Sequence, residues 1–380
     1  MNNKKKIAII GASYLQVPII LKAKQMGLET HVFAWKVGDE GEKLADYFYP
    51  ISITEKELIL ERCREIGIHG ICSIASDLAV VAVNYVAQNM NLNGNSELCT
   101  LLTTNKYNMR MALEKGGLPI PKVYFSNNND LYSLEEKDYP VICKPTDRSG
   151  SRGVNLVNNE NELKHAIKWA KKESLEGRYI IEEYIEGEEY SIECVTWRGT
   201  HQLLAVTKKY TTGAPNFIEK GHLEPAELTD DLKNRIRNII YRALDVLLIE
   251  NGASHSEIKI NSKGEIKIIE IGSRMGGDLI GSSLVPLSTG IDFTEQVIRI
   301  ALGECPQISF EKKTQFAAVR YIFDKNDIDI YTKIKREWTE IIVEEDIKEV
   351  DGEGVVDSST RKGYFVIVSE DKRLINTIMG

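Results

Sequence analysis

The stretch from Gly252 to Gly281 constrains the fold of this chain more than any other part of its sequence. Two β-rich segments, 255–260 and 265–271, flank the turn-forming residues Asn261-Ser262-Lys263-Gly264, a pattern typical of a β-hairpin. After the second segment, Gly276-Gly277-Asp278 opens a helical pattern. The stretch is therefore predicted to run strand, turn, strand, glycine loop and helix.

Each predicted strand carries one glutamate, Glu257 and Glu270. If the four turn residues form the whole loop, Ile260 pairs with Glu265, and Glu270 lies diagonally beside Glu257 on the same face, about 7 Å away. Two carboxylates that close repel each other unless a cation lies between them, and Mg²⁺ prefers oxygen ligands and substrate phosphates. A three-residue loop with a bulge would separate the faces, so the register stays open. Solvated glutamates on a hairpin are the alternative.

Arg274 follows Glu270 by four residues and directly precedes the glycine loop. A glycine loop at a helix N-terminus presents backbone N–H groups to an anion. Two acids, an arginine and an anion-binding loop in one short unit indicate phosphoryl chemistry.

The bulk composition narrows the class of protein. A chain of 380 residues is expected to form two or three domains. A net charge of −8 and an isoelectric point near 5.5 argue against a surface that binds nucleic acid and favour a protein that acts on small molecules. Four apolar residues before Gly11 are too few for a signal peptide, and no apolar run approaches a membrane span. We therefore expect a cytoplasmic protein that acts on small molecules, and the sequence leaves open whether it forms a homodimer.

The cysteines show no CxxC spacing and no cluster with histidine. They are predicted to be buried, reduced side chains rather than a disulfide or zinc framework. The six are Cys63, Cys72, Cys99, Cys143, Cys194 and Cys305.

The runs HSEIK (255–259) and EIGSRMGGD (270–278) resemble the catalytic end of the ATP-grasp superfamily, most like its amino-acid (dipeptide) ligase branch. The resemblance implies that Glu257 and Glu270 hold Mg²⁺, or Mn²⁺ as the alternative ion, on the phosphates of ATP, and that Arg274 steadies an acyl-phosphate. Many other branches carry Glu-x-Asn at the second acid. Position 272 is glycine here, which argues against the D-alanine ligase and biotin carboxylase branches.

The resemblance predicts an α/β chain with a doubly wound parallel sheet followed by an ATP-grasp fold. The predicted units are a pre-ATP-grasp (Rossmann-like) domain at 1–103, a linker helix at 104–117, a small lid subdomain at 118–186, an α+β catalytic core at 187–303 and a subdomain at 304–380 that completes the core.

The first unit also has its own sequence signal. Apolar segments at 6–11, 30–35 and 70–75 alternate with helical patterns near 15–27, 55–66 and 77–91, which is typical of a doubly wound sheet. The run Gly11-Ala12-Ser13-Tyr14 is not GxGxxG, so a dinucleotide site is disfavoured. The resemblance turns this loop and Ser76-Asp77 toward the substrate, although Asp77 is equally a candidate helix N-cap.

The lid carries the strongest local signal after the hairpin. Lys144 lies on an apolar strand, where an ammonium group is costly unless an anion meets it. The loop that follows is rich in backbone donors and could close over the β- and γ-phosphates, with a mobile hairpin loop as the alternative. It lacks the Walker A pattern. The predicted phosphate-lid residues are Ser149, Gly150, Ser151 and Gly153.

The remaining ATP contacts are implied by the resemblance alone. Lys106 and Lys144 would reach the phosphates, with a solvated helix lysine as the alternative for Lys106. Glu182 would bind the adenine amino group and the backbone of Glu183–Ile185 the adenine edge. Glu189 would bind the ribose, since a carboxylate can accept two hydroxyl protons.

The predicted substrate contacts surround the glycine loop. Arg274 with the N–H groups of Gly276 and Gly277 would hold a carboxylate. Asp278 is the nearest partner for an α-amino group, with capping of its own helix as the alternative. His222, in a predicted loop, either orients a substrate, serves as a base or has no role. The segment 304–380 carries no catalytic signal.

The sequence thus predicts an ATP-dependent carboxylate–amine ligase that forms an amide through an acyl-phosphate and releases ADP and phosphate, with an amino acid among its substrates. Lys106, Lys144 and Arg274 would be the catalytic residues. A carboxylase or carbamoyl-phosphate-type enzyme that activates bicarbonate is the alternative. A regulatory nucleotide-binding module without turnover is disfavoured, because both acids, both lysines and the arginine are retained.

Overall fold

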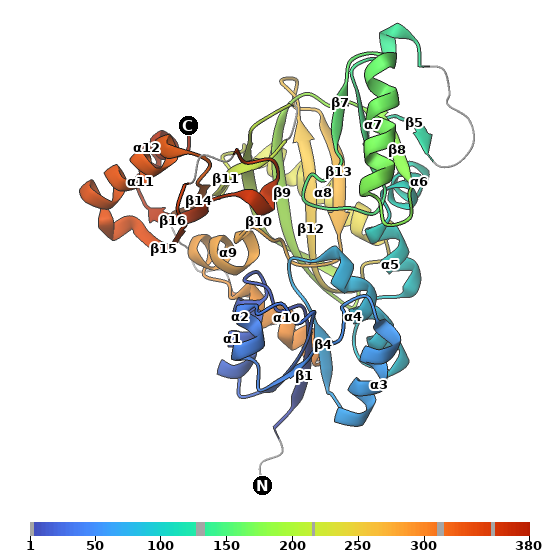
Figure 1. Cartoon of the computed structure of the whole chain (residues 1–380), viewed down its shortest axis with the longest axis vertical. Coiled ribbons are helices and arrows are strands. Elements are labelled where there is room, and N and C mark those ends of the chain that lie inside the picture. The colour runs from blue at the N-terminus through green and yellow to red at the C-terminus, as the bar shows by residue number, and fades with distance from the viewer. Residues whose placement is uncertain (1–3, 127–133, 215–216, 310–314, 351–353) are drawn as a thin grey trace.

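Three β-sheets organise the chain in the computed structural model, which describes residues 4–126, 134–214, 217–309, 315–350 and 354–380 (Figure 1). A parallel sheet lies in the N-terminal unit, a four-stranded antiparallel sheet in the lid, and an eight-stranded sheet runs through the middle of the molecule. The α/β class and the parallel N-terminal sheet expected from the sequence are confirmed.

The N-terminal unit is a parallel sheet with strand order β3-β2-β1-β4. Alternate residues of β1 enter two different cores, Ile7 and Ile9 on one face and Ala8 and Ile10 on the other. Burial on both faces explains the continuous apolar run in the sequence. The elements are β1 (Lys6–Ile10), α1 (Val17–Gln25), β2 (Glu29–Phe33), α2 (Glu40–Leu44), β3 (Tyr47–Tyr49), α3 (Lys56–Ile66), β4 (Gly70–Cys72) and α4 (Asp77–Asn89).

The cap of α4 differs from one of the two expectations. Ser76, and not Asp77, is the N-cap, because its hydroxyl oxygen accepts a hydrogen bond from the Ala79 N–H at 3.3 Å. Asp77 is the first residue of α4, and its carboxylate does not cap the helix.

Two helices, α5 (Glu97–Thr104) and α6 (Lys106–Lys115), lead into the lid. Asn105 caps α6 by accepting hydrogen bonds from the N–H groups of Tyr107 and Asn108 at 3.1 and 3.2 Å. The lid sheet has the order β5-β8-β6-β7, and α7 packs against it. Its elements are β5 (Val123–Ser126), η1 (Glu136–Asp138), β6 (Val141–Pro145), β7 (Asn155–Val157), α7 (Glu160–Glu173) and β8 (Tyr179–Glu183).

The central sheet has the order β13-β12-β9-β10-β11-β14-β16-β15, so the strands after residue 304 extend the same sheet as the strands before it. Its strands are β9 (Glu188–Trp197), β10 (Thr200–Thr211), β11 (Glu219–Glu224), β12 (Asn251–Ile260), β13 (Ile266–Gly272), β14 (Phe316–Tyr321), β15 (Ile342–Ile347) and β16 (Gly363–Ser369). The associated helices and turns are α8 (Asp230–Val246), η2 (Ile280–Leu284), α9 (Val285–Thr289), α10 (Phe293–Ala301), α11 (Lys325–Glu337), η3 (Thr339–Ile341), η4 (Ser358–Thr360) and α12 (Lys372–Met379).

The N-terminal unit and the central sheet share a hydrophobic core. One buried cluster contains Ile9 of β1, Val195 of β9, Ala253 of β12 and Phe293 of α10. This apolar packing holds the two units together and fixes the end of β4 beside the glycine loop after β13.

The burial of the cysteines agrees with the sequence-based expectation at five of six positions. Five cysteines are buried, but Cys305 is exposed, so the prediction that all six are buried is wrong for that one.

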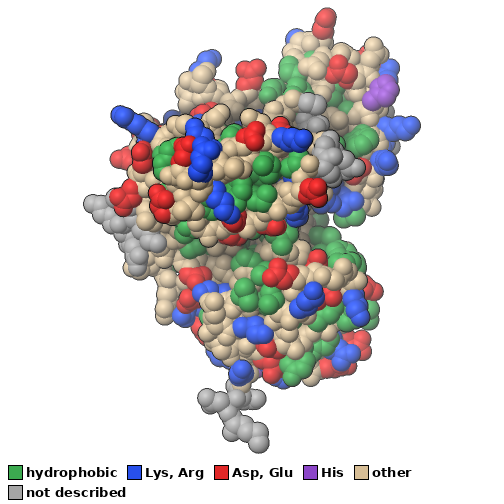
Figure 2. All heavy atoms as spheres, turned by 60° about the vertical axis from the view of Figure 1, so that its left-hand side comes forward, with side chains coloured by type: hydrophobic (Ala, Val, Ile, Leu, Met, Phe, Trp, Pro, Cys, Tyr) green, Lys and Arg blue, Asp and Glu red, His purple; other side chains and the backbone are tan. Residues whose placement is uncertain are grey.

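Lys and Arg side chains are interspersed with Asp and Glu on the face that Figure 2 shows. Within the described ranges, no helix is both long and apolar enough to cross a bilayer.

Candidate functional site

A cleft of about 1000 Å³ lies between the lid and the central sheet. We call it the lid cleft. It collects most of the predicted site residues from five separate segments of the chain, namely Lys106, Lys144, Ser149, Gly150, Ser151, Glu182, Glu183, Ile185, Glu189, Glu257, Glu270 and Arg274. Gly153 does not line it. A Cβ at Gly153 would lie 2.9 Å from Pro145, so this glycine serves the packing of the lid.

Glu257 of β12 and Glu270 of β13 form a directly opposed cross-strand pair at the centre of the cleft. The sequence left the register open, and the register with Ile260 opposite Glu265 does not occur: Ile260 pairs with Ile266, which shifts the turn by one residue. A bulge at Ile269 then shifts the register again, because Ile258 pairs with Ile268 and Glu257 with Glu270. Directly opposed residues share a face of the sheet, so the bulge restores the juxtaposition of the two acids.

Each of these acids has a lysine partner. Lys209 Nζ lies 2.5 Å from Glu257 Oε1, and Lys106 Nζ lies 2.7 Å from Glu270 Oε1. The side chain of Lys106 is only 9% exposed, which excludes a solvated helix lysine. Although burial alone would raise the pKa of Glu257, Lys209 and His255 hold it well below its usual range.

Glu257 and Glu270 are the candidate protein ligands for Mg²⁺. Among the described residues, no group of three or more His, Cys, Asp or Glu side chains converges at metal distance. Mg²⁺ is commonly bound through one or two carboxylates together with substrate phosphates and water. Glu257 and Glu270 therefore fit Mg²⁺ carried by a polyphosphate, and they do not form an all-protein metal cage.

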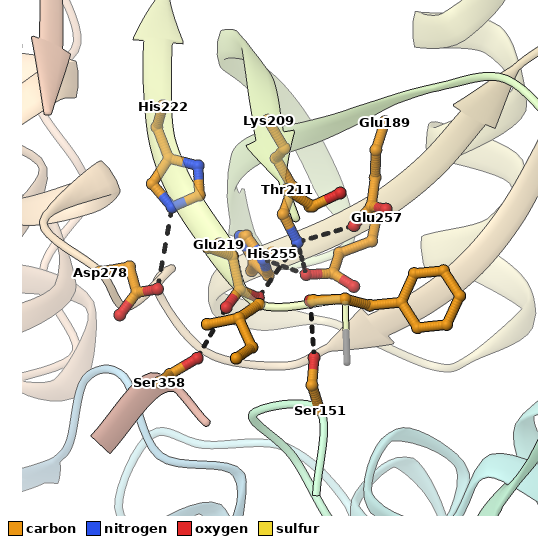
Figure 3. A network of polar contacts seen from close by, with 12 residues as sticks. Ser151, Glu189, Lys209, Thr211, Glu219, His222, His255, Glu257, Asp278 and Ser358 are labelled. Atoms are coloured by element: carbon orange, nitrogen blue, oxygen red, sulfur yellow. Dashed lines mark hydrogen bonds and ion pairs between the residues drawn. The ribbon is translucent and has the colours of Figure 1, made fainter. Parts of the chain in front are cut away.

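Lys209 is the hub of a polar network that the sequence analysis missed (Figure 3). Its ammonium group also lies 3.0 Å from Glu189 and 3.8 Å from Glu219, and its side chain is buried. Burial would lower the pKa of Lys209, but the surrounding carboxylates raise it well above its ordinary value. The available signal was a lysine on the strand that carries the apolar run 203–206, which is similar to the signal that identified Lys144.

Lys144 belongs to a second buried network, with Glu182 and Arg110. Glu182 accepts hydrogen bonds from Arg110 at 3.0 and 3.3 Å and forms an ion pair with Lys144. Burial would raise the pKa of Glu182, but these two cations lower it to about 2. Burial lowers the pKa of Lys144. Arg110 was missed, although it lies four residues after Lys106 and therefore on the same face of α6.

The far end of the lid cleft has an apolar wall. Pro121, Ile142, Val154 and Phe217 line it, and the Lys259 ammonium lies over the Phe217 ring at 5.8 Å from its centroid. Lys259 also donates a hydrogen bond to the backbone oxygen of Ile185 at 3.2 Å. Flat, apolar surroundings edged by backbone groups suit a heterocyclic base.

The loop at 149–153 is held over the cleft by two contacts. Lys106 donates a hydrogen bond to the backbone oxygen of Arg148 at 2.6 Å. The Ser151 hydroxyl donates to the backbone oxygen of Phe217 at 3.1 Å. Both contacts join the loop region to residues that line the cleft, so a ligand bound in the cleft can change the contacts of the loop.

A second pocket adjoins the lid cleft and is lined by His222, Gly277, Asp278, Tyr321 and Arg361. The two cavities share Ser149, Gly150, Lys209, Glu219, His255, Glu257 and Arg274. Arg361 and Tyr321 come from the segment after residue 304, in which the sequence carried no catalytic signal.

His222 lies on β11 and not in a loop, which corrects its predicted position. The side chain is 1% exposed, and neither ring nitrogen has a hydrogen-bond partner in the described part of the chain. Its Nε2 lies 3.7 Å from Asp278 Oδ2 (Figure 3). A buried imidazole without a hydrogen bond is costly, so this histidine is a candidate contact for a ligand.

Asp278 does not cap a helix. Its carboxylate accepts two hydrogen bonds from Arg361, at 2.7 and 3.0 Å. Burial would raise the pKa of Asp278, but Arg361 and His222 hold it well below its usual range. An ionised Asp278 is therefore already paired, and an α-amino group would share it with Arg361.

The glycine loop also differs from the prediction. The Gly276 N–H donates to Glu193 Oε2 at 2.9 Å, so it is not available to an anion. The backbone is left-handed at Asp278 (φ 51°) and Leu279 (φ 63°) and then enters a π-helical turn, η2, rather than a regular helix. Left-handed non-glycine residues are strained, and here they direct Asp278 toward Arg361.

Glu193 and His255 form a chain of polar contacts that ends at Glu257. Glu193 is fully buried and hydrogen-bonds His255 Nδ1, while His255 Nε2 lies 3.4 Å from Glu257. Burial would lower the pKa of His255, but Glu193 and Glu257 raise it to about 9. The imidazolium therefore lies between two carboxylates. Sequence reasoning missed both residues, because Glu193 lies on a different strand.

Comparison with known proteins agrees with this architecture. The ATP-grasp domain model matches residues 137–282. The alanine–anticapsin ligase of Bacillus subtilis is 27% identical over 302 residues, which cover 70% of this chain and 64% of that ligase. The chain therefore spans less than two thirds of that relative's length.

Solved structures share the fold over nearly the whole chain. The L-amino acid ligase from Bacillus licheniformis superposes with a TM-score of 0.83 at 22% identity, covering 100% of this chain and 97% of that one. The biotin carboxylase domain of the Hydrogenobacter thermophilus 2-oxoglutarate carboxylase, in complex with MgADP and bicarbonate, gives 0.74 at 18% identity, covering 96% and 86%. Residues 137–282 of the chain thus match an ATP-grasp domain, and the motifs and opposed acids of the lid cleft agree with that match.

Proposed function

We propose that the protein is an ATP-dependent carboxylate–amine ligase. The observation that carries the proposal is the continuity of the lid cleft with the second pocket, which share Lys209, Glu257 and Arg274. A nucleotide in the cleft would direct its terminal phosphate to this junction, where a carboxylate in the second pocket would meet it.

The reaction has two steps. A carboxylate oxygen attacks the γ-phosphorus of ATP, the bond to the β-phosphate oxygen breaks, and ADP leaves behind an acyl-phosphate. An amine then attacks the acyl carbon, the C–O bond to phosphate breaks, and the amine nitrogen loses a proton as the amide forms.

Named residues of the chain would support each step. Lys106, Lys144 and Arg274 carry positive charge toward the phosphates and would stabilise the charge on the transferring group. Mg²⁺ on Glu257 and Glu270 would neutralise phosphate charge when bound. The lid loop would exclude water, which otherwise hydrolyses an acyl-phosphate.

We further propose that an amino acid supplies the carboxylate. Support comes from the second pocket, whose lining includes His222, the ionised Asp278 and Arg274. These groups complement the ammonium and carboxylate of an amino acid. The names of the anticapsin ligase and the L-amino acid ligase point to the same substrate class.

Purified protein incubated with MgATP and pairs of amino acids tests the proposal. We expect ADP and phosphate in equal amounts, released only when a carboxylate substrate is present, together with a condensed product detected by mass spectrometry. ADP release that depends on bicarbonate and on no amino acid would transfer support to the carboxylase-type alternative. ATP hydrolysis that no carboxylate stimulates would refute the ligase. The Glu270→Gln variant is the background control.

A further inference from the structure

Arg274 is held by a carboxylate from a different unit of the molecule. Its Nε donates to Asp77 Oδ1 at 2.9 Å and its Nη2 to Asp77 Oδ2 at 3.0 Å. Asp77 lies on α4 of the N-terminal unit, whereas Arg274 follows β13 of the central sheet. The two side chains are 18% and 14% exposed, so solvent screens this pair only partly.

The geometry of this pair determines which donors of Arg274 remain. A guanidinium has five N–H groups in one plane. Asp77 takes the side formed by Nε and Nη2, and Nη1 makes a 3.3 Å bond to the backbone oxygen of Met275. One N–H on each terminal nitrogen has no partner in the parts of the chain that the structure describes. These two parallel N–H groups form a fork of the kind that grips phosphate or carboxylate oxygens.

Gly272 provides the space that the Asp77 carboxylate occupies. A Cβ at position 272 would lie 2.7 Å from Asp77 Oδ1, a separation at which one of the two must move. Gly272 lies in β13 and is not among the residues with positive φ, so its backbone conformation does not require glycine. The close approach of Asp77 is the physical reason for a glycine at this position.

The segment that carries Asp77 is attached to the glycine loop in a second way. The Ala75 N–H donates to the backbone oxygen of Met275 at 3.2 Å, and Ala75 itself is left-handed (φ 60°). A Cβ on Gly277 would lie 3.3 Å from the Ala75 Cβ. Backbone strain in a non-glycine residue is kept only where the surroundings impose it. The 75–77 segment and the 272–277 segment are therefore fitted to each other.

We infer that Asp77 is a positioning residue for Arg274, through which the N-terminal unit orients the anion-binding fork of the proposed ligase site. This inference rests on the proposed function for the anion that Arg274 grips. Gly272 leaves room for the Asp77 carboxylate, because any larger residue at position 272 displaces it.

Kinetics of an Asp77→Ala variant test the inference. We expect kcat to fall about 10- to 100-fold, the range found when a residue that orients a ligand-binding side chain is removed, while the KM for ATP stays unchanged. Formate has the size and charge of the deleted group and should restore part of kcat when titrated into the assay. The same formate should not rescue Arg274→Lys, because the fork itself is then lost. Gly272→Ala should reproduce the loss in kcat.

A matched control removes another ion pair between the same two units. Lys22 of α1 pairs with Asp292, just before α10, at 2.6 Å, and neither residue lines the lid cleft or the second pocket. Lys22→Ala should keep wild-type kcat. If Asp77→Ala does not fold, Asp77→Asn keeps the volume and one acceptor, and it should lower kcat without formate rescue.

A spectroscopic readout separates this inference from the proposed function. In protein labelled with ¹⁵N at arginine Nε, the Arg274 signal, assigned by its loss in Arg274→Lys, should shift and exchange faster with solvent in Asp77→Ala. If wild-type protein shows no carboxylate-dependent ADP release, the proposed ligase function is refuted. The ¹⁵N measurement on Arg274 still tests the positioning role of Asp77 in that case. An unchanged Arg274 signal, or wild-type kcat in Asp77→Ala, would overturn the positioning role.

Discussion

Glu257 on β12 and Glu270 on β13 face each other directly across a bulge at Ile269, and each is paired with a lysine, Lys209 or Lys106. The lysines reduce the repulsion between the two acids, which lie at the centre of the lid cleft. This arrangement prepares the site for a cation that arrives with a polyphosphate.

Changing Glu257 or Glu270 to Gln should lower turnover by orders of magnitude and leave the fold intact, because the amide keeps the shape and removes the charge that a cation needs. Steady-state ADP release at varied Mg²⁺, with circular dichroism, measures both effects. Glu265→Gln, in the turn of the same hairpin, is the control and should stay active. Near-normal activity of both site variants with Mg²⁺ would show that the metal assignment is wrong.

The lid loop at 149–153 should exchange its amide hydrogens more slowly when an ATP analogue is bound. Gly150 and Ser151 line the lid cleft, and the loop is attached to the core chiefly through Ser151 and the neighbouring Arg148. Phosphates would add partners for its backbone donors. Hydrogen-exchange mass spectrometry with and without the analogue measures this difference, with α3 as an internal reference. Identical exchange in both states would remove the lid role.

Asp278→Asn and Arg361→Gln should each raise the KM for the amino-acid substrate and leave the Kd for an ATP analogue unchanged. The two side chains form one pair, and the Arg361 guanidinium lies 3.6 Å from the Tyr321 ring centroid. Removing either leaves the other buried without its charge partner. The double variant should therefore cost less than the sum of the single variants, with a coupling energy of about 0.5–3 kcal/mol. Additive effects would mean that the pair does not act as a unit.

Glu224 should make the protein less stable as the pH rises toward neutrality. This fully buried carboxyl accepts hydrogen bonds from Thr207 at 2.7 Å and Ser288 at 2.5 Å. Burial, with Glu193 nearby, raises its pKa from 4.5 to about 7. The folded state then holds a proton that the unfolded state has released. The contribution of Glu224 is complete below pH 4.5 and is lost as the pH rises through 7.

Chemical denaturation across this range measures the effect. The slope from Glu224 should be on the order of 1 kcal/mol of unfolding free energy per pH unit. Glu224→Gln should remove that slope, whereas Glu57→Gln on the exposed side of α3 should keep it. Equal slopes for wild type and Glu224→Gln would contradict the prediction.

The local parts of the site could be read from the sequence because their signals lie within a few residues. Alternating apolar positions and turn residues defined the hairpin; the acids lie within it, and Arg274 and the glycines Gly276 and Gly277 follow it directly. The lysine on an apolar strand identified Lys144, which lies in the lid cleft. The parallel N-terminal sheet followed from alternating strand and helix patterns in the same way.

The register of the hairpin could not be read from the sequence. The one-residue shift at the turn and the bulge at Ile269 add up to a two-residue shift, which returns both acids to one face, and neither leaves a distinctive residue pattern. Strand pairing is decided by packing on both sides of the sheet, and β12 also pairs with β9 along its whole length.

The sequence by itself therefore determined the elements, the chemical types of the site residues and the family to which they point. Tertiary structure alone decided the partners: Asp77 for Arg274, Arg361 for Asp278, Lys209 for Glu257 and Glu193 for His255. Most of these residues lie tens to hundreds of positions apart in the chain. A hydrophobic pattern reports only which face of an element is buried, whereas an ion pair depends on which elements the packed core brings side by side.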